Sequence, residues 1–229
     1  MTVEQIVETA IAIADSDGLT GVSMIAVAKR LGCTKMALYR YVQAKDDLLT
    51  LMLDTAIGGP PESIARASGW RQAVLTWARE LLVRYRAHPW SIDVPIGGPA
   101  LTRNQMLWLE SVLQGLRPSP LQVAQKLSLV LLINGHVAFT ARLWRDRATT
   151  TEQQGPGIEQ LAELIQPGDL PEVMHVLAAG HLADEDGDGA EFDFGLSCIL
   201  DGVDALIAHR GATSVLRQKV VADEVVLEE

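Results

Sequence analysis

The stretch Ser23–Lys45, which reads SMIAVAKRLGCTKMALYRYVQAK, decides the fold of this chain because it carries the start and stop signals of two short helices. Ser23 and Thr34 are each placed to cap a helix N-terminus, since a side-chain oxygen there accepts a hydrogen bond from a free backbone N–H. Leu31-Gly32 ends the first helix, because glycine readily takes the left-handed conformation that closes one. These signals predict a helix-turn-helix with Gly32 in its turn.

The same stretch is basic, although the chain as a whole is acidic. The 229 residues include 19 basic and 29 acidic side chains, which give a net charge of −10. Residues 23–45 contain no acidic side chain and carry these basic ones: Lys29, Arg30, Lys35, Arg40 and Lys45. A basic surface confined to one part of an acidic protein indicates local contact with a polyanion. It argues against a protein that coats nucleic acid or anionic membranes.

The remaining composition is that of a globular protein in a reducing compartment. Apolar residues make up 48% of the chain and charged residues 21%. Cys33 and Cys198 lie far apart and lack metal-ligand spacing, so we expect neither a disulfide framework nor a zinc site. The N-terminus has no basic region before its apolar residues, and no apolar run is long enough to span a membrane. We therefore expect a cytoplasmic protein.

Helical spacing of apolar residues recurs along nearly the whole chain, which predicts an all-α fold of about nine or ten helices without a sheet. Helices are expected near residues 3–14, 24–31, 34–41, 45–57, 70–86, 102–116, 119–147, 158–166, 171–182 and 194–209. Residues 149–157 are predicted to form a loop, residues 183–193 a mobile acidic segment and the residues after 211 a tail. The Gly- and Pro-rich break at 57–61 separates an N-terminal domain (1–58), which holds the helix-turn-helix, from a helical C-terminal domain (59–229).

Four motifs follow one another between Ile6 and Leu53. They are Gly18-Leu19-Thr20-Gly21-Val22-Ser23, Val27-Ala28-Lys29-Arg30-Leu31-Gly32, Ala37-Leu38-Tyr39-Arg40-Tyr41-Val42 and Lys45-Asp46-Asp47-Leu48-Leu49. In order and spacing this segment resembles the N-terminal DNA-binding domain of the tetracycline-repressor (TetR) family of transcriptional regulators. The rest of the chain resembles that family in length, helical content and the terminal run Phe192–Gly202. Two departures are Val42, where the family usually has phenylalanine, and a very short N-terminal arm.

The resemblance implies that residues 34–41 are a recognition helix whose exposed residues enter the major groove. Lys35 is suited to guanine acceptors, and Thr34 or Met36 to a thymine methyl group. The predicted DNA-binding residues are Ser23, Thr34, Lys35, Met36, Tyr39, Arg40, Tyr41 and Lys45, of which Ser23, Tyr39 and Lys45 are assigned to phosphates. The core is assigned Ala28, Leu31, Leu38 and Val42. The competing interpretation of each lysine and arginine is a solvated surface charge.

Large aromatic side chains interleaved with polar ones gather between residues 70 and 144, and the family resemblance implies a small-molecule pocket in this region. The aromatic content indicates an apolar or aromatic effector. The predicted ligand-binding residues are Trp77, Trp90, Trp108, Asn134, His136, Phe139 and Arg142. The alternative is that the tryptophans are core residues and that Asn134 and His136 bind neighbouring groups. No cofactor and no metal are expected.

The last expected helix is apolar on more than one face and contains Gly195 and Gly202, which allow close helix approach. The family resemblance makes it part of a four-helix dimer interface, so the expected assembly is a homodimer through the C-terminal helices. A two-fold symmetric dimer requires a palindromic operator with half-sites about one DNA turn apart or slightly more.

The predicted function is therefore a ligand-responsive transcriptional regulator, a repressor that a small-molecule effector releases from its operator. Two alternatives remain: a helical small-molecule-binding or scaffolding protein without DNA binding, and a helical enzyme that uses His136 or His175 as a base. The acidic run at 184–189 lacks the twelfth-position carboxylate of a calcium loop, because Gly195 stands there. Cys33 is either a redox sensor or a small residue accepted in the turn.

Overall fold

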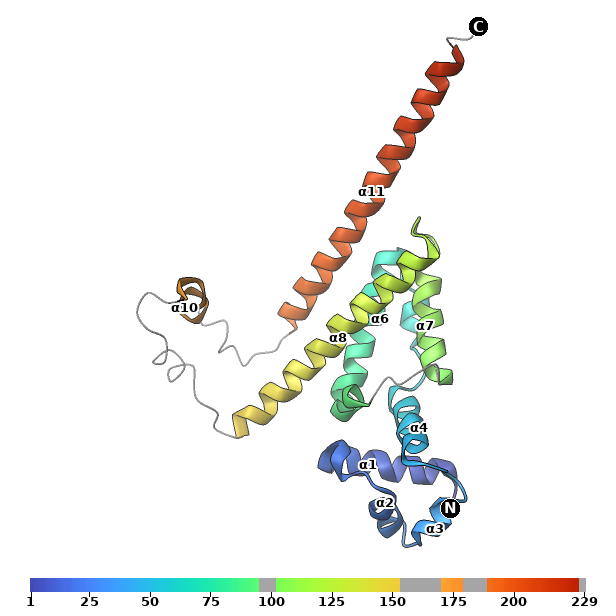
Figure 1. Cartoon of the computed structure of the whole chain (residues 1–229), viewed down its shortest axis with the longest axis vertical. Helices are drawn as coiled ribbons and strands as arrows, with labels where there is room; N and C mark the ends of the chain where they lie inside the picture. The colour runs from blue at the N-terminus through green and yellow to red at the C-terminus, as the bar shows by residue number, and fades with distance from the viewer. Residues whose placement is uncertain (95–101, 153–169, 179–188, 227–229) are drawn as a thin grey trace.

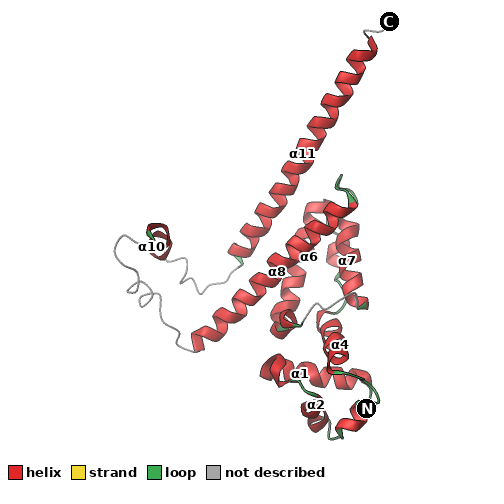
Figure 2. Ribbon diagram, viewed as in Figure 1, coloured by secondary structure: helices red, strands yellow, loops and turns green. Residues whose placement is uncertain are grey.

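The computed structural model describes residues 1–94, 102–152, 170–178 and 189–226, and within these residues it is all helical (Figures 1 and 2). The helices are α1 (Val3–Gly21), α2 (Met24–Arg30), α3 (Lys35–Leu38), α4 (Lys45–Ile57), α5 (Glu62–Ala65), α6 (Gly69–Ala87), the 3-10 helix η1 (Pro89–Asp93), α7 (Arg103–Gly115), α8 (Val123–Glu152), α10 (Pro171–Ala178) and α11 (Ala190–Val226). The predicted fold class is confirmed. The helix expected at 158–166 lies outside the described residues.

The predicted helix-turn-helix forms with the expected caps. The Ser23 hydroxyl oxygen accepts from the backbone N–H of Ala26 at 3.1 Å, and the Thr34 hydroxyl oxygen accepts from Ala37 at 3.3 Å. Gly32 has a φ of 67°, in the left-handed region where a β-carbon is disfavoured. The third helix is shorter than expected, because α3 ends at Leu38 and residues 39–41 continue as a turn.

The N-terminal helices share one apolar core. Its fully buried side chains include Ile6, Val22, Val27, Leu38, Leu48 and Met52, contributed by α1 to α4. Val42 is 2% exposed, so the smaller residue still fills the position that the family usually gives to phenylalanine. Helix α1 ends later than expected: it runs to Gly21 across a kink at Gly18, whose φ of 70° and ψ of 175° are not helical.

The C-terminal helices pack around α6, which lies against α7, α8 and η1. The Trp77 indole of α6 meets that of Trp108 in α7 edge to face, with ring centroids 6.1 Å apart. Helix α11 lies along α8 and is held by ion pairs from other helices: Arg71 with Asp201 and Asp204, Arg79 with Asp193, and Arg147 with Glu191. Its C-terminal part extends beyond the packed helices (Figure 1).

Two long helices differ from their predicted bounds. Ser119 and Pro120 do not open α8, which begins at Val123, because the buried Ser119 hydroxyl donates to the carbonyl of Leu116 and closes the end of α7 instead. Helix α8 also continues to Glu152, into part of the predicted loop, whose remaining residues lie outside the described structure. Helix α11 includes residues 190–193 and continues past Gly211, where an end was predicted, because one glycine costs a helix only about 1 kcal/mol.

Helix α8 also corrects the expectation about membrane spans. Residues Val123–Ala148 are long and apolar enough, by length and composition alone, to cross a membrane. The core helix of a soluble protein meets the same criterion, and one side of α8 is packed in the core through Leu129, Ile133 and Val137.

Candidate nucleic-acid interface and effector region

The helix-turn-helix presents a set of exposed side chains at the end of the molecule opposite the C-terminus of α11 (Figure 1). All eight predicted DNA-binding residues are exposed: Ser23, Thr34, Lys35, Met36, Tyr39, Arg40, Tyr41 and Lys45. Met36 is 73% exposed, which is costly for an apolar side chain that has no partner. The residues assigned to the core behave differently, since Ala28, Leu38 and Val42 are buried and Leu31 is half-buried.

Lys35 and Tyr39 form one feature of this surface. The Lys35 ammonium lies 5.5 Å from the centre of the Tyr39 ring, one helical turn away. At an exposed site such a contact contributes about 0.5–1 kcal/mol, which favours the lysine side chain lying over the ring. Preorganised donors bind more tightly, because less side-chain freedom is lost on association.

The phosphate assignments rest on helix N-termini with different surroundings. The Ser23 hydroxyl accepts from Ala26 and still has its own proton to donate. Lys45 is the first residue of α4, where backbone N–H groups are free, but the same turn carries Asp46 and Asp47. Asp47 accepts from the backbone N–H of Ala44 at 3.0 Å. Lys45 is therefore the one positive side chain of this turn, and it stands beside two carboxylates.

The three tryptophans of the predicted ligand site are core residues. Trp77, Trp90 and Trp108 are each 3% exposed. Every indole N–H has an acceptor: Trp77 donates to the carbonyl of Trp108 at 3.0 Å, Trp90 to a carboxylate oxygen of Asp15 at 2.7 Å and Trp108 to the carbonyl of Gly58 at 2.9 Å. These contacts match the competing interpretation, in which the indoles support the fold.

The four predicted ligand residues on α8 face different surroundings. His136 stacks on Phe192 of α11, with ring centroids 5.1 Å apart, and its Nε2 lies 3.0 Å from the Phe192 carbonyl oxygen. Asn134 is half-buried, and Phe139 is 66% exposed. Arg142 pairs with Asp93 of η1 at 3.4 Å. A surface cavity that the sequence did not indicate lies elsewhere, between α7 and the start of α8, lined by Glu110, Leu113, Gln114, Arg117 and Lys126.

Two sets of hydrogen bonds join the N-terminal helices to the rest of the chain, and the sequence gave no signal of either. Asp15 of α1 accepts from Trp90 and lies 2.9 Å from Nδ1 of His88. Asn104 of α7 donates its backbone N–H to the Asp54 carboxylate at 2.9 Å and its side-chain amide to the Asp54 carbonyl at 3.0 Å. Both sets join residues that are at least 50 positions apart in the sequence, so no local sequence pattern reveals them.

Burial raises the pKa of the Tyr85 phenol in α6 from 10.0 to about 12. Between these values the unfolded chain loses this proton while the folded protein keeps it, so stability falls by about 1.4 kcal/mol per pH unit. We expect the free energy of unfolding of the wild type, relative to that of Tyr85→Phe, to fall by about 1.4 kcal/mol from pH 8 to pH 11. Urea unfolding of both proteins measures it, since they share every other titrating group. A difference that stays constant with pH would contradict the prediction.

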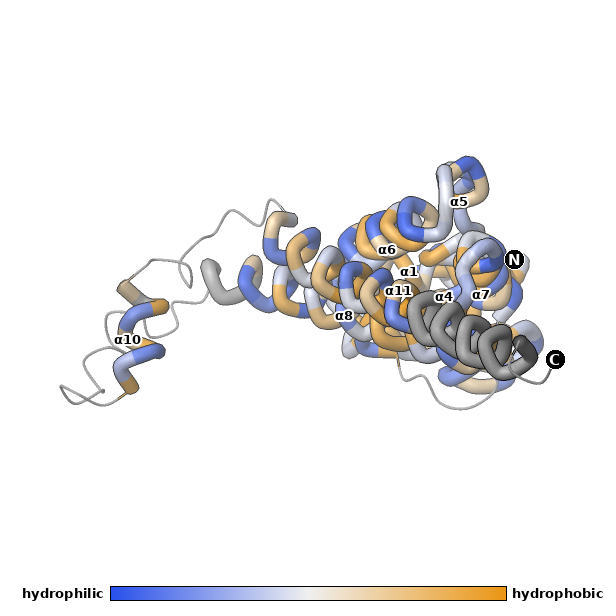
Figure 3. Tube along the Cα trace, turned by 90° about the horizontal axis from the view of Figure 1, so that it is seen from above, coloured by the Kyte–Doolittle hydropathy of each residue, from blue (hydrophilic) through white to orange (hydrophobic). Residues whose placement is uncertain are grey.

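Apolar side chains are exposed along one face of α8 and at positions of α11. Figure 3 shows the hydropathy of the residues along both helices. They are Leu127, Leu131, Leu132 and Phe139 on α8, and Phe194 and Leu206 on α11. Gly135 and Gly202 have open space where a β-carbon would point, so another backbone is able to approach closely there. We name this set of residues the apolar face. Exposed large apolar side chains that gather in this way are typical of a subunit interface.

Comparison with known proteins covers both parts of the chain. The sequence profile described as "Bacterial regulatory proteins, tetR family" matches residues 6–52, and the profile described as "Tetracyclin repressor-like, C-terminal domain" matches residues 65–207. The HTH-type transcriptional repressor DrrR1 of Streptomyces coeruleorubidus is 38% identical over 227 residues, which span 93% of this chain and 81% of that repressor.

Solved structures share the fold over most of the chain. A possible TetR family transcriptional regulator from Streptomyces coelicolor A3(2) superposes with a TM-score of 0.74 at 24% identity, over 89% of this chain and 99% of the other. The TetR family protein ActR of the same species, in a crystal structure with actinorhodin, superposes with a TM-score of 0.72 at 25% identity, over 90% of this chain and 98% of ActR.

Proposed function

Because this chain belongs to the TetR family of transcriptional regulators, we propose that it binds a palindromic operator as a homodimer and that a small-molecule effector releases it. It is a helix-turn-helix DNA-binding regulator that responds to a ligand. The observation that carries the proposal is the exposed basic surface of α2 and α3, where Lys35 and Met36 project without a protein partner to bury them.

Each exposed residue has a proposed role. Lys35 donates to guanine, and Thr34 or Met36 contacts a thymine methyl group. Arg40 and Tyr41 contact the flanking DNA, while phosphates are bound by Ser23, Tyr39 and Lys45. We place the DNA-binding domain at residues 1–58 and the effector-binding and dimerisation domain at 59–229, a division supported by the end of α4 at Ile57 and the φ of 61° at Gly58.

The homodimer proposal is supported by the apolar face of α8 and α11. Two copies of this face form a four-helix contact in which Gly135 and Gly202 allow close approach. The subunits are then related by two-fold symmetry, so the two α3 helices read a palindrome. The site of action is the cytoplasm, where operator DNA is present, and we propose no catalytic role. No group of three His, Cys, Asp or Glu side chains able to hold a metal occurs among the described residues.

The effector is proposed to be apolar or aromatic, as the aromatic side chains between residues 70 and 144 suggest. ActR, a structural neighbour, is solved in complex with actinorhodin. Among the predicted residues, half-buried Asn134 and His136 remain the candidates for direct contact. Arg142 reaches a ligand only if it leaves Asp93. Phe139 lies on the apolar face and fits the subunit contact better. The buried Trp77, Trp90 and Trp108 support the region from the core.

Selection from a random duplex library by the purified protein tests the function. We expect the library to converge on an inverted repeat, and fluorescence anisotropy to show binding that weakens steeply with salt. A pool that does not converge, or that binds without salt dependence, would remove the regulator interpretation and favour a helical binding or scaffolding protein.

Replacing Lys45 with alanine is expected to weaken operator binding about equally for all sequences. Because each lysine contact with a phosphate contributes about one unit to the slope of log affinity against log salt, a dimer should lose about two units. Anisotropy titrations at several salt concentrations measure the slope. Arg103→Ala removes the same charge from an exposed position of α7 and should leave the slope unchanged. An unaltered slope for the Lys45 variant would mean that Lys45 contacts no phosphate and is a solvated surface charge.

A further inference from the structure

The short helix η1 contacts the DNA-binding part of the chain through one carboxylate. Trp90 of η1 is buried, and its indole N–H donates to Oδ1 of Asp15 at 2.7 Å. Nδ1 of His88, the residue before η1, lies 2.9 Å from the same oxygen. Asp15 is on α1, which packs against both α2 and η1. The Asp15 side chain of α1 is therefore bound by the ring nitrogens of His88 and Trp90, which directly follow α6 in the chain.

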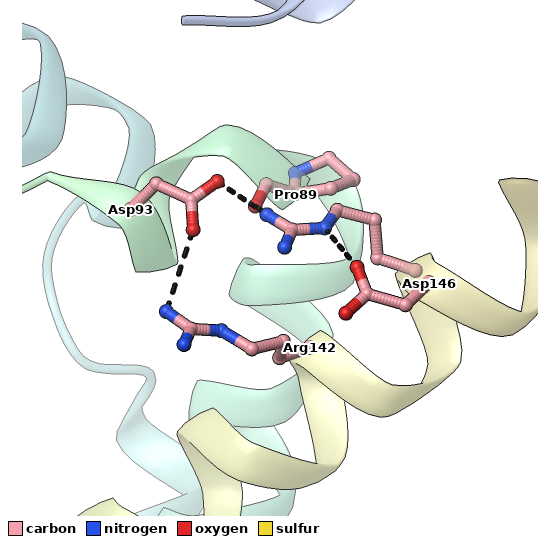
Figure 4. Close-up of polar contacts among 5 residues, drawn as sticks. Pro89, Asp93, Arg142 and Asp146 are labelled. Atoms are coloured by element: carbon pink, nitrogen blue, oxygen red, sulfur yellow. Dashed lines mark hydrogen bonds and ion pairs between the residues drawn. The ribbon is translucent and has the colours of Figure 1, made fainter.

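The same short helix is held on its other side by α8 (Figure 4). Asp93 pairs with Arg142 at 3.4 Å and with Arg145. Arg145 also donates to the carbonyl of Pro89 at 3.4 Å and pairs with Asp146 of its own helix at 3.0 Å. Both ends of η1, Pro89 and Asp93, are thus fixed to one arginine of α8.

A second connection holds the DNA-binding part independently. Asn104 of α7 binds Asp54, and Trp108 of α7 binds the carbonyl of Gly58, so α4 is fixed to α7. The orientation of the helix-turn-helix then depends on two anchors, α4 on α7 and α1 on η1. Helix α7 also packs against α8, but the second anchor reaches α8 through ion pairs, and α8 carries the apolar face and Asn134 and His136.

We propose that η1 is the element that couples α8 to the DNA-binding domain, and that Asp15 is the positioning residue through which α8 sets the orientation of α1 and hence of α3. This inference rests on the proposed function, because it concerns how operator binding is regulated. The Asp15 side chain is 37% exposed and that of His88 25%, so the contact is not locked in the core. When α8 moves, the ion pairs of Arg142 and Arg145 displace Asp93 and with it η1. The hydrogen bond from Trp90 of η1 then displaces Asp15.

The test compares operator affinity, by anisotropy, for variants at both ends of η1. Asp15→Ala and Asp93→Ala should each weaken binding about 10-fold, a common size for coupling between sites. The double variant should be no weaker than the weaker single variant, because both changes break one connection in series. Asp15→Asn, which still accepts from Trp90, should recover most of the affinity. Asp17→Ala, an exposed residue on the same helix with the same charge change, should not weaken binding.

A distance measurement separates positioning from simple loss of stability. Spin labels on Gln43→Cys, an exposed site, in a Cys33→Ser, Cys198→Ser background report the separation of the two DNA-binding domains by pulsed electron resonance. We expect a narrow distribution for the parent and a broad or shifted one for Asp15→Ala and Asp93→Ala, with melting temperatures that stay close to the parent. Unchanged distributions, additive losses or tighter operator binding would each overturn the coupling role. If the parent binds no operator, the proposed function fails, while the distances still decide the coupling.

Discussion

Replacing Lys35 and Tyr39 together with alanine is expected to lower operator affinity by at least about 100-fold and to leave the folded structure intact. A good contact between a side chain and a base is worth about 1–3 kcal/mol, and losing a hydrogen bond to a charged phosphate costs about 1.5 kcal/mol. Together they amount to about 3 kcal/mol per half-site, so the loss from one half-site alone is two orders of magnitude in dissociation constant, and a dimer makes these contacts twice. Both side chains are exposed, and they lie against each other rather than in the core.

The measurement is anisotropy with the selected operator, with the melting temperature as the check on folding. Leu38 lies between the two substituted positions and is fully buried, so the domain core is untouched. Arg103→Ala serves again as a surface control of equal charge. If the double variant binds the operator as well as the wild type does, α3 is not the reading element, and the alternative of a helical protein without a recognition helix gains support.

Replacing Leu131 with glutamate is expected to separate the dimer into folded monomers. Leu131 is 71% exposed on the apolar face of α8, and its burial between subunits contributes about 1.5–3 kcal/mol per copy. Two copies of a charge forced into this contact add a desolvation penalty. The combined loss is on the order of 5 kcal/mol, which raises the dimer dissociation constant about 1,000-fold or more. A monomer reads only one half-site, so operator binding falls with it.

Sedimentation velocity across a range of concentrations measures the change, and circular dichroism checks that the helices persist. Val83→Glu is the matched control, because Val83 is also an exposed apolar residue but lies on α6, outside the apolar face. A Leu131→Glu protein that sediments as a dimer at low micromolar concentration would place the interface elsewhere. A Val83→Glu protein that dissociates equally would show a general effect of charge.

Local signals made the helix-turn-helix predictable. Ser23, Gly32 and Thr34 act on backbone groups within three or four residues of themselves, so their sequence spacing already contains the geometry that the structure shows. The same holds for the end of α4 at Ile57-Gly58. The predicted start of α8 was wrong because it depends on tertiary packing and not on local signals. Ser119 has the composition of an N-cap, but its burial against Leu116 gives the hydroxyl another acceptor.

The effector region was the least predictable part, because tryptophan content does not reveal hydrogen-bond partners. Trp90 binds Asp15 across 75 positions and Trp108 binds Gly58 across 50. These contacts depend on how whole helices pack, so aromatic side chains that suggested a ligand site became supports of the core. The sequence predicted that α8 and α11 are apolar. It could not predict which of their apolar residues are exposed, because exposure depends on how the helices pack.

The hydrogen bonds that cross from α1 and α4 to η1 and α7 also bear on the exchange of modules between regulators. A chimera that grafts residues 1–58 onto an unrelated sensor carries Asp15, Asp54 and the Gly58 carbonyl with it, and leaves their donors behind. The grafted DNA-binding domain would keep its sequence preference but lose the interdomain hydrogen bonds through which the sensor domain is proposed to regulate it. A functional graft therefore has to transplant Trp90, Asn104 and Trp108 as part of the connector.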